Sequence, residues 1–232
     1  MEKDKNKTKQ ESPLRICPVF RQLTRSEQEN LELHKQTGVY KKGEIVYKEG
    51  TRVRGVYCVQ AGVVKHYKTG YDGKEQIIKF SKPGDIFGFR PVLSGDYACT
   101  TTQVIDNANL CLVSSTDFLQ LLNQNSYFAM DIIKLSCQEL GNANNFILDI
   151  AQKSVRERLA EVLLALDNNF GRDKDGNLKI QLTREEFAGI VGTATESVIR
   201  LLSELKKEKV IELNKRKIRL LNLSKLKQIA NL

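Results

Sequence analysis

Short hydrophobic runs separated by glycines dominate residues 39–113. The runs are rich in Val, Ile, Tyr and Thr, and strands at this spacing with glycine turns are typical of a small antiparallel barrel or roll. Asp72-Gly73 lies between two such runs, where an Asp-Gly pair is a hairpin signal. The pattern predicts an α+β protein that begins with an antiparallel β-roll, preceded by a short helix over residues 24–36.

The spacing of apolar positions changes from about Ser126 onward, where steps of four and three residues alternate. Such spacing is typical of the a/d seam along which one helix packs against another. The members of the seam are Ala129, Ile133, Ser136, Leu140, Ala143, Ile147 and Ile150. The seam predicts a long dimerisation helix over residues 126–152. The alternative is that this helix merely covers the roll, and different faces of one helix can serve both purposes.

A further amphipathic helix is expected over residues 153–168, followed by a polar loop and a short strand over residues 178–182. Thr183-x-x-Glu186 then forms a capping box, which marks a helix start because it satisfies free backbone donors of the first turn. The next glycine, Gly192, suits the left-handed backbone that often ends a helix. The segment therefore predicts a short helix with a sharp end.

A second capping box is expected at Thr193-x-x-Glu196, immediately after that turn. The apolar face of the helix it would start is formed by Val198, Leu201, Leu202 and Leu205. Two helices joined by so tight a turn form the helix-turn-helix unit. The sequence VIEL-NKRK-IRLL follows at residues 210–221 and predicts a hairpin with basic residues at its tip. The C-terminal part is therefore expected to be a winged helix-turn-helix.

Charge supports a polyanion-binding role for this part of the chain. The net charge is +9, and residues 197–232 carry ten Lys or Arg against three acids, a net of +7 that leaves +2 for residues 1–196. Concentrated positive charge favours nucleic-acid binding because each neutralised phosphate releases condensed counterions. A basic helix face that is merely solvated is the alternative interpretation of the charge taken by itself.

The second helix of such a unit lays its N-terminal residues on base edges in the major groove. The residues on that face are Thr195, Glu196, Ile199 and Arg200. Glu196 can accept a hydrogen bond from cytosine N4, and Arg200 can pair with guanine O6 and N7. Glu196 serving only the capping box is the alternative. The residues expected to contact phosphates are Thr183, Thr193, Ser197, Lys215, Arg216 and Lys217.

Composition excludes several other classes of protein. No run of about 18 apolar residues is present, and the polar start lacks the apolar region of a secretory signal. We expect a cytoplasmic protein with no membrane span. Five scattered cysteines argue against a disulfide framework and against a metal site. No nucleophile–base arrangement or P-loop is found, so no enzyme is expected.

The expected organisation has four parts. They are a disordered tail over residues 1–15, a β-roll effector-type domain over 16–125, a dimerisation helix over 126–152 and a winged-helix DNA-binding domain over 153–232.

The chain resembles the CRP/FNR superfamily of bacterial transcription regulators over about residues 16–229. The resemblance is carried by KKGEIVYKEG, VQAGVVKHY, DGKEQIIKFSKPGDIFG and IVGTATESVIRLLSELKKEKVI, in that order. It implies a cyclic-nucleotide-binding-like jelly roll, a dimerisation helix and a winged helix. It also implies a homodimer that bends a palindromic promoter site and contacts RNA polymerase. Residues 196–200 resemble the family's base-reading motif, which implies a half-site containing TTG or GTG.

The effector cassette is where the chain departs from that family. Cyclic-nucleotide binders carry FGE, whose Glu meets the ribose, and further along an Arg-Ser or Arg-Thr pair, whose Arg meets the cyclic phosphate. The corresponding positions here are Phe87, Gly88, Phe89, Tyr97, Ala98 and Cys99. A buried phosphate without a cationic partner is costly, and Arg90 is shifted by one position from Phe89. Cyclic AMP binding is therefore not expected.

The cysteines and histidines bear on other possible input signals. The iron–sulfur relatives carry an N-terminal cysteine cluster, whereas only Cys17 lies in that region, so no cluster is expected. Haem stays open as a weak alternative because His34 and His66 are present, and thiol sensing stays open for the five cysteines. The alternative to a transcription regulator is a ligand- or redox-sensing module whose helix-turn-helix is a protein-partner surface.

Overall fold

The computed structural model describes residues 13–232 of the chain. The predicted tail over residues 1–15 lies outside this part, except for its last three residues, which belong to a 3-10 helix. The chain divides into two compact units. The first holds residues up to 68 together with 79–138, and the second holds residues 69–78 together with 139–232.

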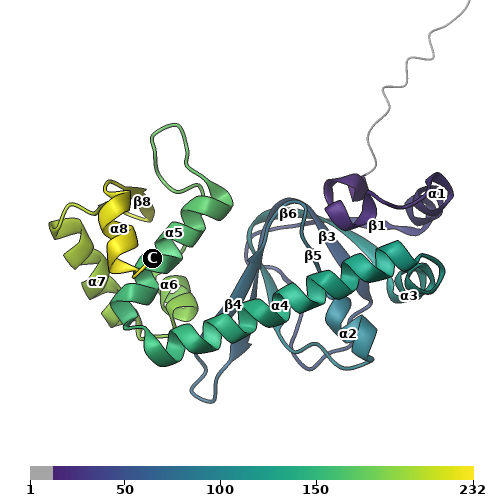
Figure 1. The fold of residues 1–232 in the computed structure, drawn as a ribbon, viewed down its shortest axis with the longest axis horizontal. Helices are drawn as coiled ribbons and strands as arrows, with labels where there is room; N and C mark the ends of the chain where they lie inside the picture. Colours follow the sequence, from purple (N-terminus) through teal and green to yellow (C-terminus); the bar gives the residue numbers. More distant parts are fainter. Residues whose placement is uncertain (1–12) are drawn as a thin grey trace, which may run out of the picture. The chain divides into compact units, whose positions relative to one another are not determined.

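The first unit is a β-roll with short helices. Its elements are η1 (Pro13–Ile16), η2 (Pro18–Phe20), α1 (Arg25–His34), β1 (Gln36–Tyr40), β2 (Ile45–Tyr47), β3 (Gly55–Thr69), β4 (Glu75–Ser81), β5 (Ile86–Phe87), α2 (Phe89–Ser94), β6 (Thr101–Ser114) and α3 (Ser115–Gln124). The main sheet order is β1-β6-β3-β4, with β2 also on β6 and β5 also on β3. The pairs of β6 with β1, β2 and β3 are antiparallel, which confirms the predicted roll (Figure 1).

The predicted hairpin at Asp72-Gly73 is confirmed. Gly73 has φ +78°, a backbone conformation that glycine adopts without strain. The backbone N–H of Gly70 donates to the carbonyl of Lys74 at 2.8 Å and closes the turn. The hairpin therefore forms where the turn residues favour it.

Two apolar clusters fill the first unit. One lies inside the sheet and contains Tyr57, Val59, Val64, Phe87, Val104, Ala108 and Leu110. The other lies under the helices, where Phe128 stacks on Phe20 and meets Phe118 edge-on, each with ring centroids 5.6 Å apart. Phe128 and Ile132 belong to the first turns of α4 (Ser126–Gln152). The N-terminal part of the long helix therefore does cover the roll, as one of the two interpretations expected.

The second unit is built from helices, the hairpin of β7 and β8, and residues 69–78 at the tip of the β3–β4 hairpin. Its elements, beyond the C-terminal part of α4, are α5 (Val155–Phe170), α6 (Arg184–Val191), α7 (Thr195–Lys207), β7 (Ile211–Asn214), β8 (Lys217–Leu220) and α8 (Leu223–Ile229). Figure 1 shows α5, α6, α7 and α8 gathered in one cluster. The helix-turn-helix and its wing are thus confirmed.

One element of the second unit was predicted wrongly. Residues 178–182 do not form a strand, because this segment pairs only at its start. Leu178 donates its N–H to the carbonyl of Ile218 at 2.8 Å, and the chain then leaves the sheet. The side chains of Leu178 and Leu182 are both buried, which accounts for the strand-like apolar spacing. Across residues 13–232, none of the helices combines the length and apolar character needed to cross a bilayer.

Candidate nucleic-acid interface

The first helix of the motif, α6, starts where the sequence predicts. Thr183 Oγ1 accepts from the N–H of Glu186 at 3.1 Å, and Glu186 Oε2 accepts from the N–H of Thr183 at 2.8 Å. The capping box is therefore complete and fixes the first turn of α6. Phe187, Ala188 and Val191 are buried, so the helix packs with one face inward.

The turn between the helices depends on one glycine. Gly192 has φ +72° and ψ +56°, the left-handed conformation that β-carbon atoms disfavour. The N–H groups of Gly192 and Thr193 both donate to the carbonyl of Ala188, at 2.9 and 3.1 Å. The second of these bonds spans five residues, as in a Schellman ending. The chain reverses sharply here and delivers α7 close to α6.

The second capping box was predicted wrongly. The N-cap of α7 is Ala194, and it makes no side-chain cap hydrogen bond. The reason is that Thr193 still belongs to the ending of α6, since its N–H donates back to Ala188. Glu196 consequently stands in the first turn of α7 without the capping role that was its alternative interpretation. Its carboxylate is exposed near the positive end of the helix dipole.

The two faces of α7 are sharply different. The inward face consists of Val198, Leu201, Leu202 and Leu205, all buried as predicted. On the outward face, Glu196, Ile199 and Arg200 are exposed, and Thr195 is half-buried. The structure therefore brings the four predicted base-reading residues to one side of the N-terminal half of α7. Arg200 Nη1 donates to Glu204 Oε1 at 2.7 Å on the same side of the helix.

The wing presents a smaller basic tip than the sequence suggests. Lys215 and Arg216 are exposed in the turn between β7 and β8, and Lys215 has φ +53°. Arg184, at the start of α6, donates from Nη2 to the carbonyl of Lys215 at 3.2 Å. The first helix of the motif thus holds the tip of the wing by a direct hydrogen bond.

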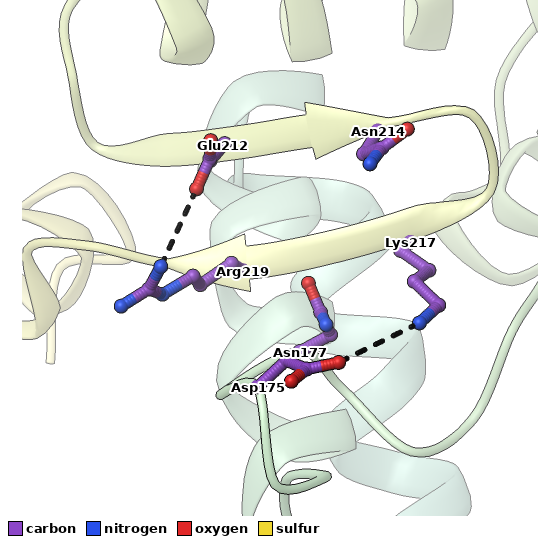
Figure 2. Close-up of a pocket in the computed structure, with 6 residues that line it drawn as sticks. All are labelled: Asp175, Asn177, Glu212, Asn214, Lys217 and Arg219. Atoms are coloured by element: carbon purple, nitrogen blue, oxygen red, sulfur yellow. Dashed lines mark ion pairs between the residues drawn. The ribbon is translucent and has the colours of Figure 1, made fainter.

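Lys217 does not share that exposed position. Its Nζ lies 3.8 Å from Asp173 Oδ2 and 4.0 Å from Asp175 Oδ2, on the loop after α5. Figure 2 shows it pointing into a polar pocket of about 200 Å³, where Arg219 also meets Glu212 at 3.7 Å. The pocket is lined by Asp175, Asn177, Glu212, Asn214, Lys217 and Arg219. These acids offset the positive charge of β8 and leave Lys215 and Arg216 as the cations at the tip.

Other predicted phosphate-contacting residues lie around α6 and α7. Thr183 is engaged as the N-cap of α6, while Thr193 and Ser197 are half-buried beside the turn. Helix α8 and the ion pairs of Arg156 with Glu204 and Glu208 are not predicted by the sequence patterns. The four-residue spacing of Arg200 and Glu204 could have suggested their contact, whereas Arg156 is too distant in sequence.

The predicted effector cassette is dispersed over two apolar clusters and the surface. Phe87 is buried inside the sheet, stacked on Tyr57 with ring centroids 5.1 Å apart, whereas Phe89 belongs to the cluster under the helices. Gly88 between them has φ +84°, and a β-carbon there would lie 2.9 Å from the carbonyl of Gly55. Two rings therefore occupy the cassette's first positions, and both point into the core.

Two arginines that are not part of the cassette lie beside its second half. Tyr97 is exposed, with the guanidinium of Arg52 5.3 Å from its ring centre. Ala98 is buried, and the half-buried Cys99 has its Sγ 3.0 Å from Arg90 Nη1. Tyr97, the position that the resemblance assigns to a phosphate-binding Arg, is thus an exposed aromatic side chain.

The two histidines differ in their surroundings. His66 is buried, with Nδ1 2.9 Å from Thr102 Oγ1 and Nε2 2.9 Å from Ser81 Oγ. Burial, and secondarily the charge of Lys79, holds its pKa well below the ordinary value. Both ring nitrogens are occupied by hydroxyl groups, so neither is free for iron in this conformation. His34 is exposed at the end of α1.

Three of the five cysteines lie together in the roll. Cys58 faces Cys111 across β3 and β6, and Cys17 hydrogen-bonds with Cys58. Burial and the neighbouring thiols raise the pKa of Cys58 well above its usual value, and burial raises that of Cys111 to about 11. These two thiols are therefore protonated and weakly nucleophilic at neutral pH.

The predicted dimerisation seam is uncovered along much of α4. Leu140 and Ile147 expose 63% and 66% of their surface, and Ile133 and Ile150 are exposed as well. The other members of the seam, Ala129, Ser136 and Ala143, are small and let a second helix approach. An apolar stripe of this kind on one long helix is suited to pairing with another helix.

Two protein-family models each match a part of this chain. "Cyclic nucleotide-binding domain" matches residues 38–125, and "Crp-like helix-turn-helix domain" matches residues 157–229. The first match covers the roll, and the second covers the helices and wing described above.

Two bacterial regulators are similar in sequence to most of this chain. It is 26% identical to the fumarate and nitrate reduction regulatory protein of Vibrio cholerae, covering 82% of this chain and 76% of the relative. It is 25% identical to electron transport regulator A of Shewanella oneidensis, covering 74% and 69%. Both relatives are named as regulators.

Solved structures share the fold. FixK2 from Bradyrhizobium japonicum superposes with a TM-score of 0.76 at 27% identity, covering 84% of this chain and 96% of that one. A transcriptional regulator of the CRP/FNR family from Thermus thermophilus gives 0.70 at 24% identity, covering 85% and 99%. The second likeness concerns the fold alone.

Proposed function

Because the chain belongs to the CRP/FNR superfamily of transcription regulators, we propose that it binds a palindromic promoter site as a homodimer without control by cyclic AMP. The observation that carries this proposal is the outward face of α7. Glu196, Ile199 and Arg200 are exposed on the N-terminal half of a helix whose opposite face is buried. Such a helix fits the major groove with these side chains toward the bases.

Base reading follows from the chemistry of two of these side chains. The guanidinium of Arg200 can donate to guanine O6 and N7, and the carboxylate of Glu196 can accept from cytosine N4. Each such pair discriminates against a wrong base by about 1–3 kcal/mol. The cations at the wing tip, Lys215 and Arg216, add phosphate contacts that hold the register without reading sequence.

Dimerisation follows from the seam of α4. Two copies that pair through Leu140 and Ile147 bury exposed apolar surface, and a two-fold axis between them presents two copies of α7. The two reading helices then engage half-sites about 34 Å apart, one turn of duplex. RNA polymerase is the expected protein partner at a promoter, on the strength of the family alone.

Independence from cyclic AMP follows from the cassette. Phe89 is buried where the family's ribose-binding Glu would stand, and Tyr97 stands in place of the phosphate-binding Arg. A nucleotide bound there would lack the Glu and the Arg of the family's cassette, and the nearby cations, Arg52 beside Tyr97 and Arg90 beside Cys99, come from other positions. Titration of the protein with cyclic AMP by calorimetry is expected to give no binding heat, and saturable binding would refute this part of the proposal.

The Arg200→Ala variant tests the reading role. It is expected to lose site-specific binding while its sedimentation stays that of the wild-type dimer. Arg219→Ala is the matched control, because it also removes an exposed, ion-paired arginine from the same unit but lies on β8 beside Glu212. Unchanged specificity in Arg200→Ala would sink the reading role and favour a protein-partner surface instead.

A further inference from the structure

A chain of alternating charges ends on Arg200. Lys225 Nζ lies 3.2 Å from Glu208 Oε2, and Glu208 Oε1 accepts from Arg156 Nη2 at 2.6 Å. Arg156 Nη1 in turn lies 3.4 Å from Glu204 Oε2, while Glu204 Oε1 accepts from Arg200 Nη1 at 2.7 Å. The five groups come from α5, from α7 and its C-cap residue Glu208, and from α8, all within the second unit.

Glu204 holds its two arginines without competition between them. Each carboxylate oxygen serves one guanidinium, so the bond to Arg156 does not displace the bond to Arg200. Glu204 is also partly withdrawn from solvent, with 36% of its side chain exposed against 66% for Arg200. Arg156 therefore anchors Glu204 from α5, and Glu204 steadies the more exposed Arg200.

The direction of this support matters for base reading. Glu204 lies one turn beyond Arg200 toward the C-terminus of α7, away from the end that enters a groove. It uses one nitrogen of a guanidinium that has five N–H donors. Donors on Nε and Nη2 remain for guanine O6 and N7, so the bond to Glu204 and the bond to a base can exist together.

The geometry points to Glu204 as a positioning residue that raises the base selectivity of Arg200. This inference rests on the proposed function. An arginine held in one rotamer loses less conformational freedom on binding, so more of its hydrogen-bond energy appears as discrimination. Glu204 also places a negative charge near the duplex, which weakens binding to any sequence. Glu204 thus trades general affinity for selectivity, and the two effects have opposite signs.

These opposite signs define the test. A motif is first selected from a randomised duplex library with the wild-type protein, and the base pair read by Arg200 is defined as the one whose preference Arg200→Ala removes. Dissociation constants are then measured for the selected duplex, for the same duplex with that base pair changed in both half-sites, and for an unrelated duplex. Glu204→Gln is compared with Glu212→Gln, which removes the same charge from the wing.

Selectivity is the dissociation constant for the changed duplex divided by that for the selected duplex. Glu204→Gln is expected to lower this ratio by about threefold to tenfold, since it loosens one exposed, ion-paired arginine per half-site. Its affinity for the unrelated duplex is expected to be equal or higher. Glu212→Gln should keep the ratio within about twofold. Arg156→Met, which removes the anchor of Glu204, should shift the ratio in the same direction by a smaller factor.

Three results would overturn the inference. One is a wild-type ratio in Glu204→Gln; another is an equal loss in Glu212→Gln; the third is tighter and more selective binding, which would make the ion pair autoinhibitory. Thermal unfolding of each variant identifies a loss caused by misfolding, in which case Arg156→Met carries the test. Two other results would refute the proposed function itself. They are a wild-type protein that enriches no motif from the library, and an Arg200→Ala variant that keeps the wild-type base preference at every position.

Discussion

Lowering the pH is expected to destabilise the β-roll through a single buried imidazole. His66 is fully enclosed, and its two ring nitrogens lie 2.9 Å from the hydroxyls of Thr102 and Ser81. A neutral imidazole has one donor and one acceptor, and a hydroxyl can complement either. A protonated ring would bury a positive charge near Lys79 with no carboxylate among its hydrogen-bond partners. The folded state therefore keeps His66 neutral.

The size of the effect follows from linkage. The folded-state pKa of His66 lies well below its ordinary value of 6.5, so the unfolded chain binds a proton that the folded chain refuses. The stabilisation is fully present above the unfolded pKa and is lost progressively as the pH falls below it. Between about pH 7.5 and about pH 5.0, protonation of the unfolded imidazole removes up to about 2 kcal/mol from the free energy of unfolding.

Urea unfolding at the two pH values measures this loss. Carboxylates also titrate in this range, so His66→Gln serves as the reference, because its amide can bond both hydroxyls but takes up no proton. The wild-type roll is expected to lose about 2 kcal/mol more than the variant over the same interval. Equal losses in the two proteins, or an NMR titration of His66 with a pKa near 6.5, would refute the reasoning.

Two further predictions concern the second unit and the seam. Thr183→Ala removes the capping box of α6 and is expected to cost about 1 kcal/mol in urea unfolding, whereas Thr183→Ser keeps the acceptor and should cost less; equal costs would contradict the capping role. Leu140→Asp places a charge in the exposed seam of α4 and is expected to shift sedimentation toward the monomer, while Asp131→Asn, off the seam, should not. A dimer of unchanged stability in Leu140→Asp would place the interface elsewhere.

Local signals were the most predictive part of the sequence. Thr183-x-x-Glu186 works because both of its hydrogen bonds form within one helical turn, and Gly192 works because its own backbone conformation decides the turn. The same capping rule fails at Thr193, where the N–H is already committed to Ala188 in the ending of α6. A sequence pattern cannot reveal which of two overlapping local structures takes a given donor.

Long-range features of the site were not predictable from one sequence. Arg156 and Glu204 are 48 residues apart, and their contact depends on how α5 and α7 each pack against α6. The sequence likewise predicts Lys217 as a member of the basic wing tip. In the structure its ammonium group lies beside Asp173 and Asp175, which the loop after α5 brings next to β8. The sequence alone identifies Phe89 and Tyr97 as departures from the family's cassette. Only the structure shows that Phe89 is buried and that Tyr97 is exposed.

Sequence-selective DNA binding through α7 can be measured as a ratio of dissociation constants. The wild-type protein is measured on its selected duplex and on an unrelated duplex of equal length, at about physiological salt, beside Arg200→Ala. The wild-type ratio is expected to be about a thousandfold or more. Arg200→Ala is expected to lower it at least about tenfold, as the loss of one bidentate base contact in each half-site requires. A wild-type ratio near one would show that the protein does not bind DNA sequence-selectively.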